Sequence, residues 1–391
     1  MKFAHLSDCH IGAWREDTLR DINLKSFEKA IEICIQEYVG FVIIAGDLFD
    51  TALPSIDILK QTAKILHKLK DHDIPVYIIP GSHDFSSSGK TMLDVLENSG
   101  LLINVMKFND NKLIFTEDRT GVKLTGMYGK KGGLETSELE KLEKEHLEKE
   151  PGFKIFLFHT LLTELKPKEF ERIETKPLTI LPKNFDYYAG GHPHFIYSQK
   201  QEGYGMLAYP GPIYPNNFEE LERLKQGSFF IVEVKNNKII PKNIALKIKE
   251  VVSYKITAEN KTPQEVQEEI LNTIKDYGDK IITIRIEGCL SSGKISDINF
   301  KQIFENFREA YLILKNTSKL TTKEFEEFSI DTRNIDEIES TILKEHQGQS
   351  ILPEDKTLNL MNLLDKEKLE GEKNADFELR IIKEIKNLIE L

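Results

Sequence analysis

The sequence predicts an α/β protein in which a mostly parallel β-sheet is buried between helices. Short apolar runs rich in β-branched residues alternate with helical apolar stripes over residues 1–80. The strand-like runs are continuously apolar, as in parallel sheets that are covered on both faces. The pattern changes beyond residue 235 and again beyond residue 328, which predicts three parts: 1–235, 236–328 and 329–391.

The first part carries the clearest strand signals. The runs in question are Phe3–Leu6, Phe41–Ala45, Val76–Ile79, Val122–Met127, Ile155–Phe158, Tyr187–Ala189 and Phe229–Val234. Two helical stripes, Phe27 to Tyr38 and Ile58 to Leu69, separate the first three strands. Their spacing of three to four residues indicates helices that pack on the sheet.

The second part reads as a compact βαβαβ unit. Its predicted elements are a strand at 251–256, a helix at 263–277, a strand at 280–287, a helix at 298–310 and a strand at 311–314. In the third part the strand signals stop, and residues 375–391 form an amphipathic helical stripe. We expect such a tail to pack on a partner or back on its own domain.

Composition excludes several classes of protein. The hydrophobic fraction of 40% and the charged fraction of 30% are those of a globular protein in water. No apolar run approaches the roughly 20 residues of a membrane span. Cys9, Cys34 and Cys289 have unrelated spacings, which fits neither a disulfide framework nor a thiolate zinc site. With no signal-peptide pattern at the N-terminus, the sequence predicts a cytoplasmic protein.

The net charge of −11 does not exclude a nucleic-acid partner. Residues 135–150 carry a net charge of −4 and residues 331–391 a net charge of −6. The rest of the chain is therefore nearly neutral, and its charge leaves DNA or RNA open without favouring either.

Polar residues suited to metal binding follow five of the predicted strands. In chain order they are Asp8 and His10, then Asp47 and Asp50, then Ser82, His83 and Asp84, then His159, and finally His192 and His194. Each cluster alone is more often a turn or a hydrogen-bonded core residue. Together they are informative, because ends of strands in one open sheet converge in space.

The chemistry of this set points to divalent metals. Imidazole and carboxylate groups without thiolates suit manganese, iron or zinc rather than calcium. Seven or eight ligands are too many for one ion. They indicate two ions roughly 4 Å apart that share a carboxylate, as in enzymes that hydrolyse phosphate esters.

The order of these motifs resembles that of the calcineurin-like metallophosphoesterases. The motifs are Asp8-Cys9-His10, Gly46-Asp47, Gly81-Ser82-His83-Asp84, His159 and Gly191-His192-Pro193-His194. Residues 5–12 and 46–50 are similar, more narrowly, to the SbcD / meiotic-recombination-eleven DNA repair nucleases of archaeal type. This resemblance implies a β-sheet sandwich flanked by helices over residues 1–235, a DNA-capping domain over 236–328, and a helical tail that binds an SMC-like ATPase of the SbcC/Rad-fifty type.

The resemblance also implies roles for single residues. Asp8, His10 and His194 would hold a first Mn²⁺, which Asp47 would bridge to a second. His159, His192 and the residue at position 82 would complete the second site. His83, held by Asp84, would be the general acid. The implied activity is Mn²⁺-dependent 3′–5′ exonuclease and single-strand or hairpin endonuclease cleavage of DNA, by a homodimer in double-strand-break repair.

The chain departs from the family pattern at two positions. Ser82 stands where the family normally has Asn, and its shorter side chain predicts a weaker second metal site. Asp50 stands where many relatives carry a phosphate-contacting His, so it is expected to be a turn residue or a partner of a ligand.

Two other functions remain open from the sequence. One is a phosphomonoesterase or cyclic-nucleotide phosphodiesterase on the same metal scaffold. Residues 46–51 lack the Arg-Gly pair that protein phosphatases place after this Asp, which argues against it. The other is a non-catalytic scaffold subunit with a degenerate second metal site, which Ser82 alone supports.

Overall fold

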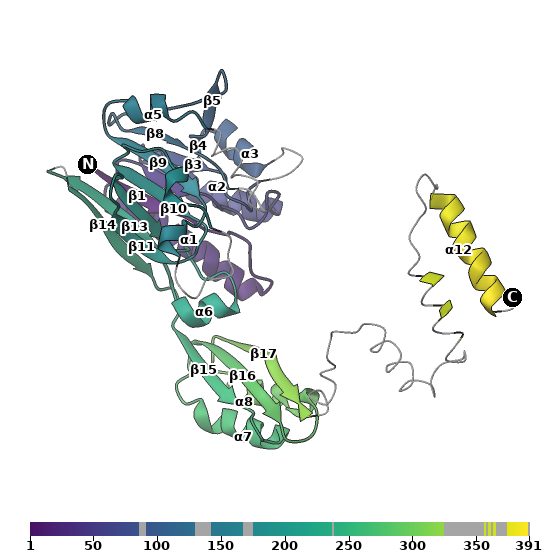
Figure 1. The fold of residues 1–391 in the computed structure, drawn as a ribbon. Helices are drawn as coiled ribbons and strands as arrows, with labels where there is room; N and C mark the ends of the chain where they lie inside the picture. Colours follow the sequence, from purple (N-terminus) through teal and green to yellow (C-terminus); the bar gives the residue numbers. More distant parts are fainter. Residues whose placement is uncertain are drawn as a thin grey trace.

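A computed structural model describes residues 1–85, 91–129, 142–166, 175–236 and 238–323, and in the tail 356, 359–360, 363–364 and 374–389 (Figure 1). Two six-stranded sheets and their helices form a first unit, residues 1–246. A three-stranded sheet with two helices forms a second unit, residues 251–322. The predicted α/β fold with a β-sheet sandwich is confirmed.

The first sheet has the order β14-β13-β1-β2-β3-β4. Its strands are β1 (Lys2–Leu6), β2 (Val42–Ala45), β3 (Val76–Ile79), β4 (Ile103–Asn104), β13 (Gly227–Lys235) and β14 (Lys238–Leu246). The run from β1 to β4 is parallel, whereas β13 and β14 are antiparallel to their neighbours. Helices α1 (Asp17–Gln36), α2 (Ile56–Asp71) and α3 (Met92–Asn98) supply the connections between the parallel strands.

The second sheet has the order β11-β12-β10-β9-β8-β7. Its strands are β7 (Thr116–Glu117), β8 (Lys123–Gly126), β9 (Lys154–His159), β10 (Tyr187–Gly191), β11 (Ile196–Lys200) and β12 (Met206–Pro210). A small hairpin, β5 (Lys107–Asn109) and β6 (Lys112–Ile114), precedes it, and α5 (Glu145–Lys149) precedes β9. Residues 130–141, which include part of the acidic segment 135–150, lie outside the described part of the chain.

The side chains of β1 show how the first sheet is buried on both faces. Phe3 points between the two sheets, where it stacks on Phe41 and meets the edge of Tyr187. Ala4 and Leu6 point the other way, into the core that the sheet shares with α1 and α2. Because alternate residues of a strand face opposite sides, a strand with core on both sides is apolar at most positions. The buried His5 of β1 is accommodated by a contact of 2.9 Å between its Nδ1 and the Tyr187 hydroxyl.

β14 corrects the predicted boundary at residue 235. This strand pairs with β13 along its whole length, from Lys238 opposite Lys235 to Leu246 opposite Gly227. Residues 238–246 therefore belong to the first unit rather than to the second part of the chain. Within the described part of the chain, this strand has a neighbour in the sheet on one side only, and Lys238, Pro241 and Lys242 are residues that such edge strands tolerate.

The second unit has the predicted βαβαβ order. Its elements are β15 (Val251–Thr257), α7 (Pro263–Thr273), β16 (Ile281–Leu290), α8 (Phe300–Asn306) and β17 (Leu312–Thr322). The three strands are parallel, with β16 in the centre. Thr262 begins α7 with a capping box, in which its hydroxyl accepts from the Glu265 N–H and its own N–H donates to the Glu265 carboxylate.

An apolar cluster joins the two units, and we call it the junction cluster. It contains Trp14, Leu19, Ile22, Tyr214 and Leu221 of the first unit together with Val251 and Ile281 of the second. Leu221 lies on α6 (Phe218–Leu224), which Figure 1 shows at the junction between the two units.

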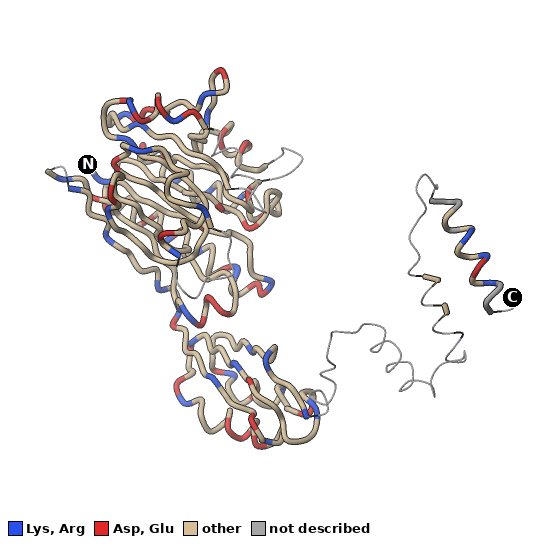
Figure 2. The backbone as a smooth tube through the Cα atoms, in the orientation of Figure 1, with Lys and Arg blue, Asp and Glu red and all other residues tan. Residues whose placement is uncertain are grey.

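Most of the predicted tail, residues 329–391, lies outside the described part of the chain. Its α12 (Asn374–Ile389) covers most of the helix predicted at 375–391. In Figure 2, basic and acidic residues are interspersed along both units. Among the described residues, no helix combines the length and the apolar character needed to cross a membrane.

Candidate metal centre

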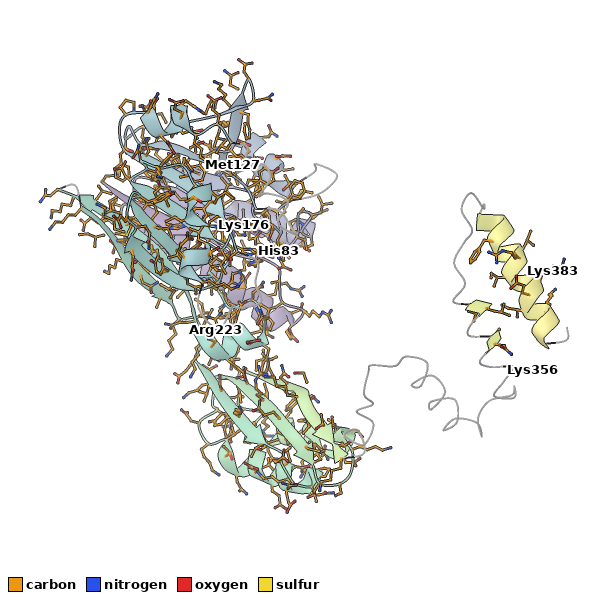
Figure 3. All side chains as sticks on the ribbon, in the orientation of Figure 1. His83, Met127, Lys176, Arg223, Lys356 and Lys383 are labelled. Atoms are coloured by element: carbon orange, nitrogen blue, oxygen red, sulfur yellow. The ribbon has the colours of Figure 1, made fainter. Side chains whose placement is uncertain are left out.

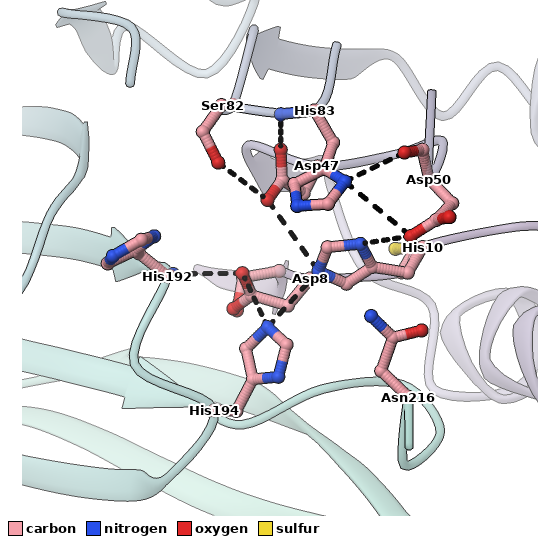
Figure 4. A network of polar contacts seen from close by, with 12 residues as sticks. Asp8, His10, Asp47, Asp50, Ser82, His83, His192, His194 and Asn216 are labelled. Carbon is pink, nitrogen blue, oxygen red and sulfur yellow. Dashed lines mark hydrogen bonds and ion pairs between the residues drawn. The ribbon is translucent and has the colours of Figure 1, made fainter. Parts of the chain in front are cut away.

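The predicted ligands converge at one edge of the sandwich (Figure 4). Asp8 and His10 follow β1, Asp47 follows β2, and residues 82–84 follow β3 of the first sheet. His159 ends β9 of the second sheet, and residues 192–194 follow β10. Backbone hydrogen bonds from Asp8 N–H to Gly46 O and from His10 N–H to Asp47 O tie the first two loops together.

Five of the candidate ligands have unusual backbone conformations. Asp8, His10, Asp47, His192 and His194 have φ values between 41° and 96°. Residues other than glycine seldom adopt this left-handed region, and such strain gathers at functional sites. The positive φ values of these five residues turn the chain sharply within the first few residues after each strand.

Glycines provide the space that the centre needs. A Cβ at Gly81 would lie 2.2 Å from Asp47 Oδ1, and a Cβ at Gly46 would lie 2.2 Å from His159 Nδ1. A Cβ at Gly191 would lie 2.2 Å from the carbonyl oxygen of Ala45. Each separation is far shorter than a van der Waals contact, so these positions accept only glycine without movement of the site.

Two buried carboxylates form the middle of the centre. Asp47 Oδ1 accepts a hydrogen bond of 2.7 Å from the His83 backbone N–H. Its Oδ2 lies 3.1 Å from His159 Nε2. Asp8 accepts hydrogen bonds from the His192 backbone N–H at 2.9 Å and from the Ser7 hydroxyl at 2.6 Å. Asp47 thus connects residues of both sheets, as a bridging ligand must.

Three imidazole rings point their Nε2 atoms at these carboxylates. His194 Nε2 lies 3.5 Å from Asp8 Oδ1, and His10 Nε2 lies 3.6 Å from Asp47 Oδ2. Behind each ring, Nδ1 faces an oxygen. His159 Nδ1 donates to the Ala45 carbonyl at 2.8 Å, His194 Nδ1 lies 2.9 Å from Glu220 Oε1, and His10 Nδ1 lies 3.2 Å from Asp50 Oδ1.

This arrangement fits divalent metal ions. Histidines that bind metals through Nε2 almost always have Nδ1 held by a carboxylate or a carbonyl. His10 Nε2 and His194 Nε2 also face each other at 3.1 Å, a contact that needs a proton or another cation between the two nitrogens. Potential ligand atoms cluster within 4.8 Å of one another in three groups: Asp8/His10/His194, Asp8/Asp47/His159 and His10/Asp50/His83.

The charges of the centre also require cations. Burial by itself would raise the pKa of Asp8 and of Asp47, but the neighbouring imidazoles hold the pKa of both far below the usual range. Burial would lower the pKa of His159 and of His194, but Asp47 and Asp8 respectively, the nearest carboxylates, raise these to about 9 and about 10. Protonated imidazoles or metal ions can supply the positive charge, and metal binding would release those protons.

Ser82 and His192 lie at the side assigned to the second metal. Ser82 is buried, and its hydroxyl donates to Asp47 Oδ2 at 3.4 Å. The His192 ring packs edge-on against His159, with 5.3 Å between ring centroids, and it belongs to none of the three groups. Burial, reinforced by the charge of His159, lowers the pKa of His192 to about 4. The ligand roles of Ser82 and His192 stay predictions.

The predicted orientation of His83 by Asp84 is wrong. The Asp84 carboxylate instead accepts hydrogen bonds from the backbone N–H groups of Leu48, Phe49 and Gly81, at 3.0 to 3.1 Å. Asp84 is therefore a clamp between the loops after β2 and β3, and burial, with the charge of Asp47, raises its pKa to about 6. His83 Nδ1 donates instead to the Asp50 carbonyl oxygen at 2.7 Å.

Asp50 is more than a turn residue. Its backbone carbonyl fixes the His83 ring, and its carboxylate lies 3.2 Å from His10 Nδ1 and 3.5 Å from His83 Nδ1. Burial would raise the pKa of Asp50, but its contact with His10 lowers it. The alternative of a partner to a ligand is thus the one that the geometry favours.

Sequence reasoning missed Ser7, Asn216 and Glu220. The Glu220 carboxylate faces His194, and the Asn216 and Asn217 loop supports that carboxylate with two hydrogen bonds of 2.8 Å. Asn217 with Glu220 three residues later is the pattern of a helix start. That pattern gave a signal for α6, but not for its contact with a histidine more than twenty residues earlier.

The centre opens into a pocket of about 290 Å³. Its lining comprises His10, Asp47, Ser82, His83, His192, Pro193, His194, Asn216, Asn217, Glu220 and Arg223. Figure 3 shows Arg223 on α6, where the first unit meets the second. The pocket therefore gives a substrate access to the predicted acid and to the predicted ligands other than the buried Asp8 and His159.

Comparisons with known proteins agree with this site. Residues 1–195 match the model of the calcineurin-like phosphoesterase family. The DNA double-strand break repair protein Mre11 of Archaeoglobus fulgidus is 24% identical over 353 residues, which cover 84% of this chain and 78% of that protein. Mre11 of Methanococcus maripaludis is 26% identical, covering 83% of this chain and 90% of that protein. Mre11 of Methanocaldococcus jannaschii is 27% identical, with 88% of each protein covered.

A solved dimetal phosphatase from Danio rerio superposes with a TM-score of 0.42 at 10% identity, covering 63% of this chain and 98% of that one. The family model spans β1 to the loop after β10, and all five ligand-bearing strand ends lie within it. Residues 1–195 belong to the calcineurin-like phosphoesterase family, and the chain is similar over most of its length to the archaeal Mre11 proteins.

Proposed function

We propose that this protein is a metal-dependent DNA nuclease that acts in double-strand-break repair. The observation that carries the proposal is the pair Asp8 and Asp47, surrounded by three imidazoles whose Nε2 atoms point at them. This ligand set suits two ions that share a carboxylate, an arrangement used for phosphoester hydrolysis. DNA as the substrate is supported by the names of the archaeal relatives.

Each residue of the centre has a part in this proposal. Asp8, His10 and His194 would hold one Mn²⁺, and His159, His192 and Ser82 would hold the second, with Asp47 as a ligand of both. Such ions, when bound, orient and acidify the attacking water and balance charge on the phosphate. The protein fixes the ring orientations through Asp50, Glu220 and the Ala45 carbonyl.

His83 is the proposed general acid. Because a carbonyl oxygen can only accept, the hydrogen bond to Asp50 O places a proton on His83 Nδ1. Nε2 is then the atom that exchanges a proton with the leaving oxygen. His83 lines the pocket, which gives a bound phosphodiester access to it.

The assembly is also part of the proposal. We propose a homodimer in which the second unit caps the DNA and the tail binds an SMC-like ATPase of the SbcC/Rad-fifty type. The helix α12 supports the tail assignment because it is amphipathic, with Phe377, Ile381 and Ile385 four residues apart among charged residues. Co-purification with the ATPase, with and without residues 330–391, tests it. Retained binding after truncation would exclude the tail as the docking segment.

The test of activity compares substrates. Purified protein with Mn²⁺ is given 3′-recessed, single-stranded and hairpin DNA, and in parallel p-nitrophenyl phosphate. We expect cleavage of DNA, lost on chelation and in Asp8→Ala, with little hydrolysis of the monoester. Hydrolysis of the monoester alone would favour the phosphomonoesterase. Digestion of DNA in the 5′–3′ direction would contradict the proposed 3′–5′ exonuclease activity.

Ser82 supports one competing function, a non-catalytic subunit with a single metal. The serine hydroxyl reaches Asp47 only at 3.4 Å and is a shorter neutral ligand than an amide. Mass spectrometry under non-denaturing conditions counts the ions bound per chain. Two ions favour the nuclease, whereas one ion or none, with no cleavage of DNA, favours the scaffold.

A further inference from the structure

α6 contacts both the metal centre and the second unit. Three consecutive side chains leave this helix in three directions, since neighbouring residues lie about 100° apart around a helix axis. Glu220 reaches His194, Leu221 packs in the junction cluster, and Glu222 pairs with Arg285 of β16. The helix therefore links a predicted metal ligand to the neighbouring unit through contacts that are all buried or half-buried.

On the metal side, the Glu220 carboxylate is fixed to the start of the helix. Its Oε2 accepts from the Asn216 backbone N–H at 2.8 Å, and its Oε1 accepts from Asn217 Nδ2 at 2.8 Å. Asn217 Oδ1 in turn accepts from the Glu220 N–H at 2.9 Å. The same Glu220 Oε1 also lies 2.9 Å from His194 Nδ1. The carboxylate cannot shift independently of α6, so a displacement of α6 displaces the support of His194.

On the other side, Arg285 holds α6 with a directional contact. Arg285 Nε lies 2.9 Å from Glu222 Oε2 and 3.2 Å from Oε1, and a terminal nitrogen lies 2.5 Å from Oε2. The guanidinium group also lies over the Phe218 ring, 5.3 Å from its centroid. The side chains of the pair are 15% and 18% exposed. A bidentate, half-buried ion pair fixes orientation as well as distance.

We propose that the second unit positions a ligand of the metal centre through α6. In this scheme Glu220 is a positioning residue for His194, and Arg285 acts on the same histidine through Glu222 and the helix. The inference deepens the proposed function, since it assumes that His194 binds a metal ion. It gives the second unit a role within the metal centre itself, in addition to any contact with substrate.

The test measures Mn²⁺ affinity in the full chain without DNA, by electron paramagnetic resonance of free Mn²⁺. Glu220→Gln should weaken one site by about 10- to 100-fold, as loss of outer hydrogen-bond partners does elsewhere. Arg285→Met and Glu222→Gln act on His194 only through α6, so they should weaken the same site by about tenfold, the lower end of that effect. The control is Lys261→Met, which breaks the ion pair with Glu269 within the second unit and should leave affinity within twofold of the parent.

Unchanged Mn²⁺ affinity in Glu222→Gln would overturn the proposal, because this near-isosteric change removes the charge pair with little effect on folding. A loss in Lys261→Met equal to that in Arg285→Met would overturn it too, because the effect would then be general destabilisation. The proposed nuclease function fails separately: a parent protein that binds Mn²⁺ but leaves DNA intact would refute the substrate and not the role of α6.

Discussion

At the scale of single residues, the metal centre depends on positions where a side chain is not tolerated as much as on its ligands. Gly81 lies directly against Asp47, the carboxylate that both proposed ions share. An added methyl group there would lie 2.3 Å from the Asp47 backbone nitrogen as well as 2.2 Å from its Oδ1. The carboxylate or the loop after β3 must therefore move if this glycine is replaced.

Gly81→Ala should lower the free energy of unfolding by about 1–3 kcal/mol through overpacking. It should also reduce cleavage by about 100-fold, because displacement of about 1 Å at a reacting centre has effects of that size. Gly278→Ala is the matched control, since no described atom lies within 4 Å of a Cβ at that position. Denaturant titration and a nuclease assay measure the two effects. Equal behaviour of the two variants would contradict the steric account.

Ser82→Asn should strengthen the second metal site. The amide oxygen of Asn extends farther than the serine hydroxyl and is a better neutral ligand for a divalent ion. We expect tighter binding of the second Mn²⁺ by calorimetric titration, with binding of the first ion unchanged. If Ser82→Asn and Ser82→Ala bind the second ion as the parent does, position 82 takes no part in that site.

Substitution of His83 should mainly lower activity, whereas substitution of Asp84 should mainly lower stability. His83→Gln removes the proposed acid and should lower the cleavage rate by about 10²- to 10⁴-fold, while stability changes little. Asp84→Ala leaves three buried backbone N–H groups without an acceptor and should lower the free energy of unfolding by about 3 kcal/mol or more. Denaturant unfolding curves and DNA cleavage rates of the two variants measure these effects. A stable Asp84→Ala protein would contradict the clamp.

Residue identity at strand ends could be predicted, but side-chain contacts between loops could not. The position of Asp47 follows from the strand before it, because strand ends meet at one edge. The partner of Asp84 depends on how two loops fold back, which the strand pattern does not determine. Glu220 escaped prediction for a similar reason: the sequence marks it as a helix-start residue, and the turn that brings it to His194 is tertiary structure.

At the scale of secondary structure, α1 supports the loop that carries Asp8 and His10. Asn23, buried on this helix, donates through Nδ2 to the Cys9 carbonyl oxygen at 2.9 Å. Ser26, equally buried one turn later, donates instead to Ile22 within the same helix. Asn23 thus supports the loop that carries Asp8 and His10, whereas the hydrogen bond of Ser26 stays within α1.

Asn23→Ala should weaken Mn²⁺ binding severalfold and lower the free energy of unfolding by about 1–2 kcal/mol, because it removes a buried hydrogen bond. Ser26→Ala should leave Mn²⁺ binding unchanged, whatever its smaller effect on stability. Calorimetric titration of both variants with Mn²⁺ measures the difference. Similar Mn²⁺ affinities for the two would show that the hydrogen bond to Cys9 does not shape the metal loop.

Interior strands were easier to predict than edge strands. Strands β2 and β3 are apolar throughout, and β1 is apolar apart from Lys2 and His5, because both faces of these strands are covered. This pattern is strong in sequence. In β14, exposed lysines and Pro241 interrupt the apolar residues, as suits an edge. Its sequence therefore resembles a linker, which placed the predicted boundary at 235 rather than after Leu246.

At the scale of the whole molecule, the two units share buried apolar surface. The predicted βαβαβ pattern identified the second unit, because each of its elements has its own clear period. The junction cluster could not be predicted, since Trp14 and Ile281 are far apart in sequence and the apolar pattern around each residue does not identify the residues packed against it. Together with the pair Arg285–Glu222, this cluster predicts that the two units respond to one another.

Mn²⁺ should therefore stabilise both units together. An ion that binds the folded state adds about 2.7 kcal/mol per site at 100 times its dissociation constant. Because the junction cluster joins the units, differential scanning calorimetry should show one unfolding transition for both. The temperature of this transition should rise with Mn²⁺ and fall on chelation. Asp47→Asn, which weakens the shared ligand, should abolish most of the shift. A separate transition of the second unit that ignores Mn²⁺ would contradict this coupling, and with it the role assigned to α6.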